Sequence, residues 1–203
     1  MADSRRTVIP LMLLGDGQVG KTSLTKRLTG NVFEDSQLTT IGKESYVYQT
    51  QLHGYDVKMK IWDTAGQERF KSMSVNVIKN VEGLILTYSI ASRESFQNLD
   101  NWLKQLNDAD DLSKKPIIIV GNKSDLEASR EVSKDEGKQF ADSHDYHFFE
   151  TSAKTAENVK EAFDDIFEQL YKLFEDEITG KKENKIKIEL KNDIKRKKTC
   201  CAN

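Results

Sequence analysis

Apolar positions along the chain fall into two patterns, uninterrupted runs and helical stripes. Three runs are apolar at nearly every position, as in strands that are buried on both faces of a parallel sheet. They span Val8–Leu14, Gly83–Ser89 and Ile117–Gly121. A fourth segment, Tyr146–Glu150, predicts the last strand.

Between the first two runs, apolar and polar residues alternate, which predicts an antiparallel hairpin. Its strands are Ser45–Leu52 and Asp56–Trp62, joined around His53 and Gly54. In the second strand the apolar positions are Val57, Met59 and Ile61, and they alternate with Lys58, Lys60 and Trp62.

Helical stripes predict the remaining elements. Lys21–Thr29 follows the first strand, and Ser92 is placed to cap a later helix. Ser133 and Glu136 have the spacing of a capping box, for a short helix that ends near Ser143. The expected core positions are Phe96, Leu99, Leu103 and Leu106 in the helix after Ser92, and Val159, Phe163, Ile166, Phe167, Leu170, Tyr171 and Phe174 in a long final helix.

These elements predict one α/β domain over residues 1–178, because 203 residues with 37% hydrophobic content can bury a full core. From Thr179 onward charge replaces the apolar pattern, which predicts a disordered tail over residues 179–203. Apolar runs are too short to cross a membrane and Met1–Thr7 is polar, so we expect a cytosolic domain. Both cysteines, Cys200 and Cys201, lie in the tail, so we expect no disulfide framework or zinc site in the domain.

Charge is distributed unevenly, although the net charge of the whole chain is only −2. Lys181–Asn203 contains nine basic and three acidic residues, so the domain itself is acidic. An acidic domain is a poor candidate for nucleic-acid binding. The basic tail could be attracted to an anionic membrane surface.

The segment Gly15–Thr22 matches G-x-x-x-x-G-K-[ST] between the first strand and the first helix. Glycines at these positions let backbone N–H groups wrap a phosphate, and the N-terminus of the following helix favours an anion. Lys21 is expected to reach the β- and γ-phosphates of a nucleotide, and Thr22 to hold Mg²⁺.

Two further segments have the composition of the loops that contact a γ-phosphate. Asp63 ends a predicted strand, where it is expected to hold Mg²⁺ through water, and Gly66 and Gln67 follow it. Gly66 could donate its N–H to the γ-phosphate, and Gln67 could orient the attacking water. In the polar loop before the hairpin, Thr40 could give a hydroxyl to Mg²⁺ and an N–H to the γ-phosphate.

A third group of residues predicts recognition of guanine. Asn122-Lys123-Ser124-Asp125 follows a buried strand, and the Asp125 carboxylate can accept both the N1–H and the exocyclic N2 hydrogens of guanine. Thr151-Ser152-Ala153-Lys154 reaches the same edge, where a backbone N–H could contact the guanine O6. Phe33 is either a loop residue tucked under the domain or an aromatic contact to the base.

Together these motifs resemble those of the Ras-like small GTPases over Val8–Ile178. The resemblance implies a six-stranded, mostly parallel sheet flanked by five helices, and a P-loop site for GTP or GDP with Mg²⁺. It assigns Thr40, Asp63, Gly66 and Gln67 to the switch segments. The nucleotide contacts that it implies are Gly15, Asp16, Gly17, Gln18, Val19, Gly20, Lys21, Thr22, Ser23, Phe33, Asn122, Lys123, Asp125, Ser152, Ala153 and Lys154.

Within that superfamily the chain is most similar to the Rab family, through Lys60–Phe70 and the terminal Cys200-Cys201. The resemblance implies geranylgeranyl groups on both cysteines and a place on the cytoplasmic face of an intracellular membrane, with cycling to the cytosol. It also implies a monomer that regulates vesicle trafficking with an exchange factor, an activating protein, effectors and a prenyl-binding carrier. Ile41–Ser45 and Val77–Val81 differ from the Rab pattern in effector-facing regions. A Ras-type signalling GTPase is the alternative.

Two other classes compete with a slow GTPase switch. A P-loop kinase would need an acceptor pocket and lid arginines, and the guanine motif at Asn122–Asp125 argues against it. A GTP-binding scaffold without turnover would not need Gly17 and Gln67, which hydrolysis would keep.

Overall fold

The apolar runs form the centre of a six-stranded sheet in the computed structural model, which describes residues 8–30, 43–64 and 78–180. The strand order is β2-β3-β1-β4-β5-β6, and β2 is antiparallel to β3 while all other neighbours are parallel. The strands are β1 (Val8–Leu14), β2 (Lys43–Leu52), β3 (Tyr55–Thr64), β4 (Gly83–Ser89), β5 (Ile117–Asn122) and β6 (His147–Thr151).

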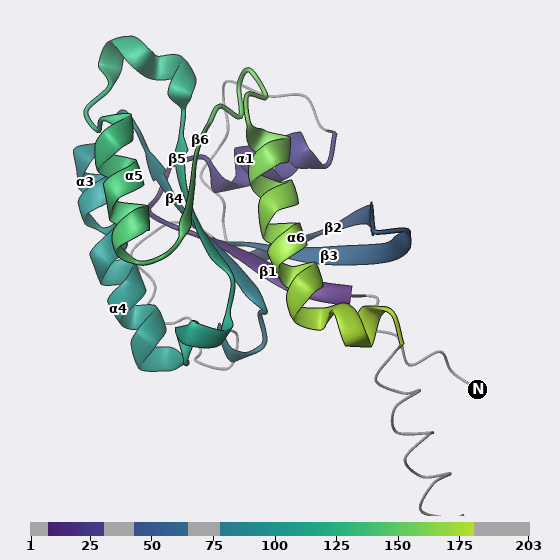
Figure 1. Ribbon diagram of the computed structural model, residues 1–203. Helices are drawn as coiled ribbons and strands as arrows, with labels where there is room; N and C mark the ends of the chain where they lie inside the picture. The colour runs from purple at the N-terminus through teal and green to yellow at the C-terminus, as the bar shows by residue number, and fades with distance from the viewer. Residues whose placement is uncertain (1–7, 31–42, 65–77, 181–203) are drawn as a thin grey trace, which may run out of the picture.

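Helices cover both faces of this sheet, with α1 and α6 on one side and α3, α4 and α5 on the other (Figure 1). Two short 3₁₀ segments, η2 (Leu112–Lys114) and η3 (Ser124–Ser129), flank β5. The α-helices are α1 (Lys21–Leu28), α3 (Arg93–Gln97), α4 (Leu99–Ala109), α5 (Lys134–Ser143) and α6 (Val159–Ile178). The predicted α/β fold, a six-stranded mostly parallel sheet with five helices, is confirmed within the described residues.

Alternate residues of β1 supply the two halves of the core. Leu11 and Leu13 pack in the cluster that includes Phe163 and Phe167 of α6. Met12 faces the opposite cluster, which contains residues of α4 and α5. Full burial of such side chains stabilises the fold by about 1.5–3 kcal/mol each, so β1 holds both helical layers to the sheet.

Most element boundaries agree with the sequence pattern, and the capping box of Ser133 and Glu136 is present at α5. The single helix expected after Ser92 is instead two helices that meet at Asn98. The side chain of Asn98 does not cap α4; its amide instead donates a hydrogen bond to Asp16 at 2.7 Å, 82 residues earlier in the chain. No helix in the part of the chain that the structure describes is both long and apolar enough to span a membrane.

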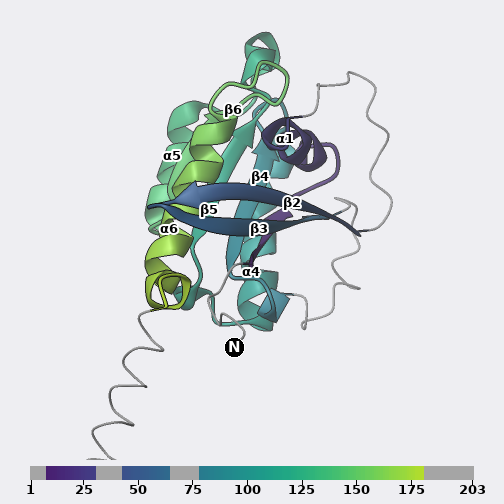
Figure 2. The same cartoon turned by 90° about the vertical axis from the view of Figure 1, so that its right-hand side faces the viewer.

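The carboxyl ends of the parallel strands β1, β3, β5 and β6 point to one end of the sheet, because parallel neighbours share a direction. α1 and the loops after β5 and β6 lie together in the upper part of both views (Figures 1 and 2). The predicted functional segments that the structure describes therefore converge on this end.

Candidate functional site

The loop between β1 and α1 depends on two glycines. Gly15 has φ +136°, and a Cβ at that position would lie 2.0 Å from the Thr87 carbonyl oxygen. Gly20 has φ +99°, and a Cβ there would lie 2.3 Å from Nδ2 of Asn122. Both positions combine a left-handed backbone with close packing, so only glycine fits without a shift of the neighbours. The two glycines of the motif are thus required by the backbone conformation of this loop, and glycine-rich loops of this kind can wrap a phosphate.

Lys21 begins α1 and is only 4% exposed. Its ammonium donates to the carbonyls of Gly15 at 2.8 Å and Asp16 at 2.7 Å, so the side chain bridges the loop. Burial lowers the pKa of Lys21 to about 8, while the carboxylates of Asp63 and Asp16 act in the opposite direction. Because burial disfavours the charged form of Lys21, an anion that enters beside it would stabilise the ammonium.

Thr22 and Asp63 meet beside this lysine. β1 and β3 are in register with Leu13 opposite Asp63, which brings the fully buried Asp63 to the start of α1. The Thr22 hydroxyl donates to Oδ2 of Asp63 at 2.5 Å. Within residues 8–30, 43–64 and 78–180, no three His, Cys, Asp or Glu side chains form a metal cluster. One hydroxyl and one carboxylate fit Mg²⁺, which takes few protein ligands and completes its shell with phosphate and water.

Asn122 joins three segments of the site. It is the last residue of β5, 1% exposed, and its Nδ2 donates to the Val19 carbonyl at 2.8 Å. Its Oδ1 accepts from the Thr151 hydroxyl at 3.2 Å and from the Ala153 N–H at 3.4 Å. Asn122 therefore fixes the phosphate loop against the segment that follows β6.

Asp125 and Ser152 connect the two segments that were predicted to recognise guanine. The Ser152 hydroxyl donates to Oδ1 of Asp125 at 2.5 Å, and Asp125 itself is exposed at the site end of the sheet. Lys123 has a left-handed backbone, φ 69°, and burial lowers its pKa although Asp125 opposes the shift. The carboxylate is thus oriented by a neighbour and accessible to a ligand.

Sequence reasoning missed several residues that hold the site together. Two of them, Asn98 and Trp102, donate hydrogen bonds to the predicted contact Asp16, from the Asn98 amide at 2.7 Å and from the Trp102 indole N–H at 2.8 Å. Arg27 donates to the carbonyls of Ala153 at 2.8 Å and Lys154 at 2.9 Å. The polar atom of Trp102, on an otherwise apolar helix face, was the one available signal that this side chain needs a partner.

The other predicted contacts divide into two groups. Gly17 and Ser23 are half-buried, and Gln18 is exposed with φ 61°. These three residues lie in the loop or at the start of α1, as predicted. Phe33, Thr40, Gly66, Gln67, Cys200 and Cys201 lie outside the described residues.

Comparisons with known proteins agree with this geometry. The family model described as the Ras family matches residues 10–172. The chain belongs to the Ras family.

Curated relatives in this family are similar over most of their length. The chain is 43% identical over 161 residues to the Ras-related protein RGP2 of Oryza sativa subsp. japonica, and the aligned region covers 79% of the chain and 74% of RGP2. It is 38% identical over 163 residues to the Ras-related protein Rab-13 of Bos taurus, and the aligned region covers 80% of the chain and 80% of that relative. It is 37% identical over 207 residues to the Ras-related protein RABA1b of Arabidopsis thaliana, which covers 95% of the chain and 93% of that relative.

These Ras family relatives decide between the two predicted branches. Their names are of the Rab type, so the chain is a Rab-like small GTPase rather than a Ras-type signalling protein. The predicted enzyme class, a GTPase, is confirmed by the same family membership.

Proposed function

We propose that the site at the carboxyl ends of the strands binds GTP and GDP with Mg²⁺, and that hydrolysis there switches the chain between two states. The observation that carries this proposal is Asn122, whose buried amide joins the phosphate loop at Val19 to the guanine segment at Ala153. A single ligand that spans a phosphate cradle and a base-recognition loop fits this connection.

The phosphate end of the ligand lies in the cradle of Gly15–Gly20. The Lys21 ammonium exchanges its carbonyl partners for phosphate oxygens, and Thr22 and Asp63 hold Mg²⁺, Asp63 through water. When bound, Mg²⁺ neutralises charge on the β- and γ-phosphates.

Three residues outside the described part complete the reaction by the family motif. Gln67 orients the water that attacks the γ-phosphorus, and the N–H groups of Gly66 and Thr40 contact the γ-phosphate. Thr40 also gives its hydroxyl to Mg²⁺. An activating protein supplies an arginine in trans, a contribution of about 10³- to 10⁵-fold in rate.

The guanine end is read by Asp125, which accepts from N1–H and N2–H of the base. Asn122, Lys123 and the segment Ser152–Lys154 surround the base, and Phe33 covers its edge. Because adenine lacks this donor pair, the site discriminates against ATP.

The Rab-type relatives and the tail support a role at membranes. Prenyl groups on Cys200 and Cys201 anchor the GTP-bound chain to the cytoplasmic face of an intracellular membrane, where it recruits effectors of vesicle transport. A carrier of the Rab type extracts the GDP-bound monomer, and an exchange factor reloads it. The acidic domain argues against a nucleic-acid partner.

Nucleotide exchange and single-turnover hydrolysis test the proposal. Purified chain should bind fluorescent GTP with Mg²⁺ dependence, lose it to excess GTP but not to ATP, and release phosphate once per bound nucleotide. Gln67→Leu should bind equally and hydrolyse at least about tenfold more slowly. Competition by ATP equal to that by GTP would overturn the guanine assignment, and unchanged hydrolysis in Gln67→Leu would remove Gln67 from the mechanism.

A further inference from the structure

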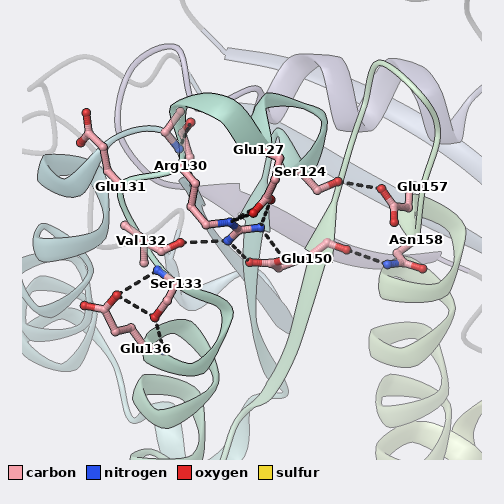
Figure 3. A network of polar contacts seen from close by, with 12 residues as sticks. Ser124, Glu127, Arg130, Glu131, Val132, Ser133, Glu136, Glu150, Glu157 and Asn158 are labelled. Carbon is pink, nitrogen blue, oxygen red and sulfur yellow. Dashed lines mark hydrogen bonds and ion pairs between the residues drawn. The ribbon is translucent and has the colours of Figure 1, made fainter.

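Arg130, next to the guanine end of the site, is the centre of a polar network (Figure 3). Its guanidinium makes a bidentate ion pair with Glu150 of β6, in which Nη1 donates to Oε1 at 2.6 Å and Nη2 donates to Oε2 at 3.1 Å. It also contacts Glu127 of η3 and donates to the Val132 carbonyl at 2.9 Å. One arginine thus connects η3, the segment before α5 and the last strand.

Each end of this ion pair lies close in sequence to a predicted base contact. Arg130 directly follows η3, which carries Asp125. Glu150 comes two residues before Ser152 and pairs in register with Gly121, next to Asn122. The Arg130–Glu150 pair therefore joins the two segments that Asp125 and Ser152 bring together at the base.

Smaller contacts in the same view support the same junction (Figure 3). The Ser124 hydroxyl donates to Glu157 at 2.9 Å, and Asn158 donates to the Glu150 carbonyl at 2.9 Å. Both contacts are exposed, and exposed polar contacts contribute little. The Arg130–Glu150 pair is the better shielded, with side chains 18% and 10% exposed.

Loss of one partner from a shielded pair has a large effect, because the remaining charge is left buried without compensation. Neutralising Arg130 would leave the half-buried Glu150 carboxylate without its partner, two residues before Ser152 in the chain. η3 would then be less firmly held. Each binding event would have to order it again, and this entropic cost lowers the affinity for the nucleotide.

We propose that Arg130 is a positioning residue for guanine recognition, acting through Glu150 to hold Asp125 and Ser152 in one arrangement. This inference rests on the proposed function of the site. Arg130 makes no contact with the base itself in this scheme. Its loss speeds nucleotide release through the Asp125 contact and leaves the phosphate cradle intact.

Arg93 provides a matched control in the same region. It pairs with Glu136 at 2.5 Å, with side chains 39% and 42% exposed, and joins the start of α3 to α5. Arg93→Met removes an arginine–glutamate pair as Arg130→Met does, but this pair does not connect the two guanine segments.

The test compares GDP with inosine diphosphate, which lacks the exocyclic N2 group that Asp125 accepts from. Full-length parent, Arg130→Met, Glu150→Gln, the double variant and Arg93→Met are loaded with ribose-labelled GDP or inosine diphosphate. Dissociation is followed with Mg²⁺ and excess unlabelled nucleotide. Arg130→Met should release GDP about tenfold faster than parent, but inosine diphosphate less than about threefold faster. The double variant should be no worse than either single change, and Arg93→Met should resemble parent.

Several outcomes would overturn the inference. Equal acceleration with both nucleotides means a merely structural role, as does a rate for Arg130→Met that matches Arg93→Met. If Arg130→Met is insoluble, Glu150→Gln tests the same pair with the same two nucleotides. The parent is also loaded with ribose-labelled ADP, and similar release rates for GDP and ADP would contradict the proposed function itself. A parent that retains GDP selectively, with variants that release it at the parent rate, would contradict only the inference about Arg130.

Discussion

The Asn122 side chain donates a hydrogen bond to the Val19 carbonyl, 103 residues earlier in the chain, at 2.8 Å. The same amide accepts from Thr151 and Ala153 through its oxygen. Since both atoms of one buried amide are used, the phosphate and base segments cannot move independently without breaking a buried hydrogen bond.

Asn122→Asp should therefore weaken both the fold and nucleotide binding. The variant keeps the size of the side chain but replaces the donor Nδ2 with an acceptor that faces the Val19 carbonyl. We expect the free energy of unfolding to fall by about 1–3 kcal/mol and GDP affinity to fall at least about tenfold. Denaturant unfolding and GDP titration measure the two effects, with Asn107→Asp on the exposed face of α4 as the control. A variant with parent-like affinity would contradict the linkage.

Asp125→Asn should change base preference. An amide can present a donor where guanine also presents donors, so GTP affinity should fall by more than about tenfold, or 1.4 kcal/mol. Xanthine carries a carbonyl at C2, so the variant should bind its triphosphate better than the parent does. Competition titration with both nucleotides checks this, and a change in GTP affinity below about threefold would refute the guanine assignment.

Thr22→Asn should weaken the binding of GTP more than the binding of GDP. The Thr22 hydroxyl, which donates to Asp63 at 2.5 Å, is the proposed metal ligand. Binding of GTP depends on Mg²⁺ more than binding of GDP does, because the metal ion also contacts the γ-phosphate. We expect the ratio of GTP to GDP affinity to fall at least about tenfold, and chelation of Mg²⁺ to accelerate GDP release in parent more than in the variant. Thr29→Asn, at the other end of α1, is the control. An unchanged affinity ratio would remove Thr22 from the metal site.

Glu136 should make stability depend on pH. Its bond to Arg93, and then those to Ser133, lower its pKa to about 2. A depressed carboxylate pKa contributes stability above the ordinary value near 4.5, and this contribution is lost as pH falls from there toward 2. The difference in unfolding midpoint between parent and Glu136→Gln should be constant above pH 5 and shrink on acidification. Urea titrations at pH 7, 5, 4 and 3 test this, and a difference that persists at pH 3 argues against it.

Serine at both Cys200 and Cys201 should release the chain from membranes. One lipid chain holds a protein only marginally, at about 0.8 kcal/mol per buried CH₂, whereas two chains or one chain with a basic segment hold it firmly. We expect the double variant in the soluble fraction with unchanged GTP binding, and each single variant, which keeps one lipid chain and the basic segment, to stay mainly in the membrane fraction. Fractionation and intact-mass measurement check this, and the absence of prenyl mass on the native chain would exclude prenyl anchoring.

Local chemistry made much of this molecule predictable. Gly83–Ser89 is mostly apolar, with Thr87 and Ser89 as its polar exceptions apart from the Tyr88 hydroxyl, and the structure buries every residue of β4. Ser133 and Glu136 each accept a hydrogen bond from the backbone N–H of the other, only three residues apart. This capping box was therefore predictable without knowledge of the fold. The conformation of the loop between β1 and α1 was predictable for the same reason, because its glycines and Lys21 lie within seven consecutive residues, 15–21.

Contacts between distant segments were not predictable in this way. The bond from Trp102 to Asp16 spans 86 residues and depends on where α4 lies relative to the loop that follows β1. Arg27 was predicted only as part of a helix, although it holds the carbonyl of Ala153. Arg130 resembles any charged loop residue until β6 brings Glu150 beside it.

Lys21 holds a buried ammonium against two backbone carbonyls, so in the proposed cycle only the nucleotide-bound chain gives this charge a phosphate partner. By mass action, a ligand that binds only the folded form raises the population of that form. On the proposed function, nucleotide therefore acts as a folding ligand as well as a signal. An exchange factor that removes it would have to stabilise the nucleotide-free chain, and exchange would in this sense be an assisted-folding reaction.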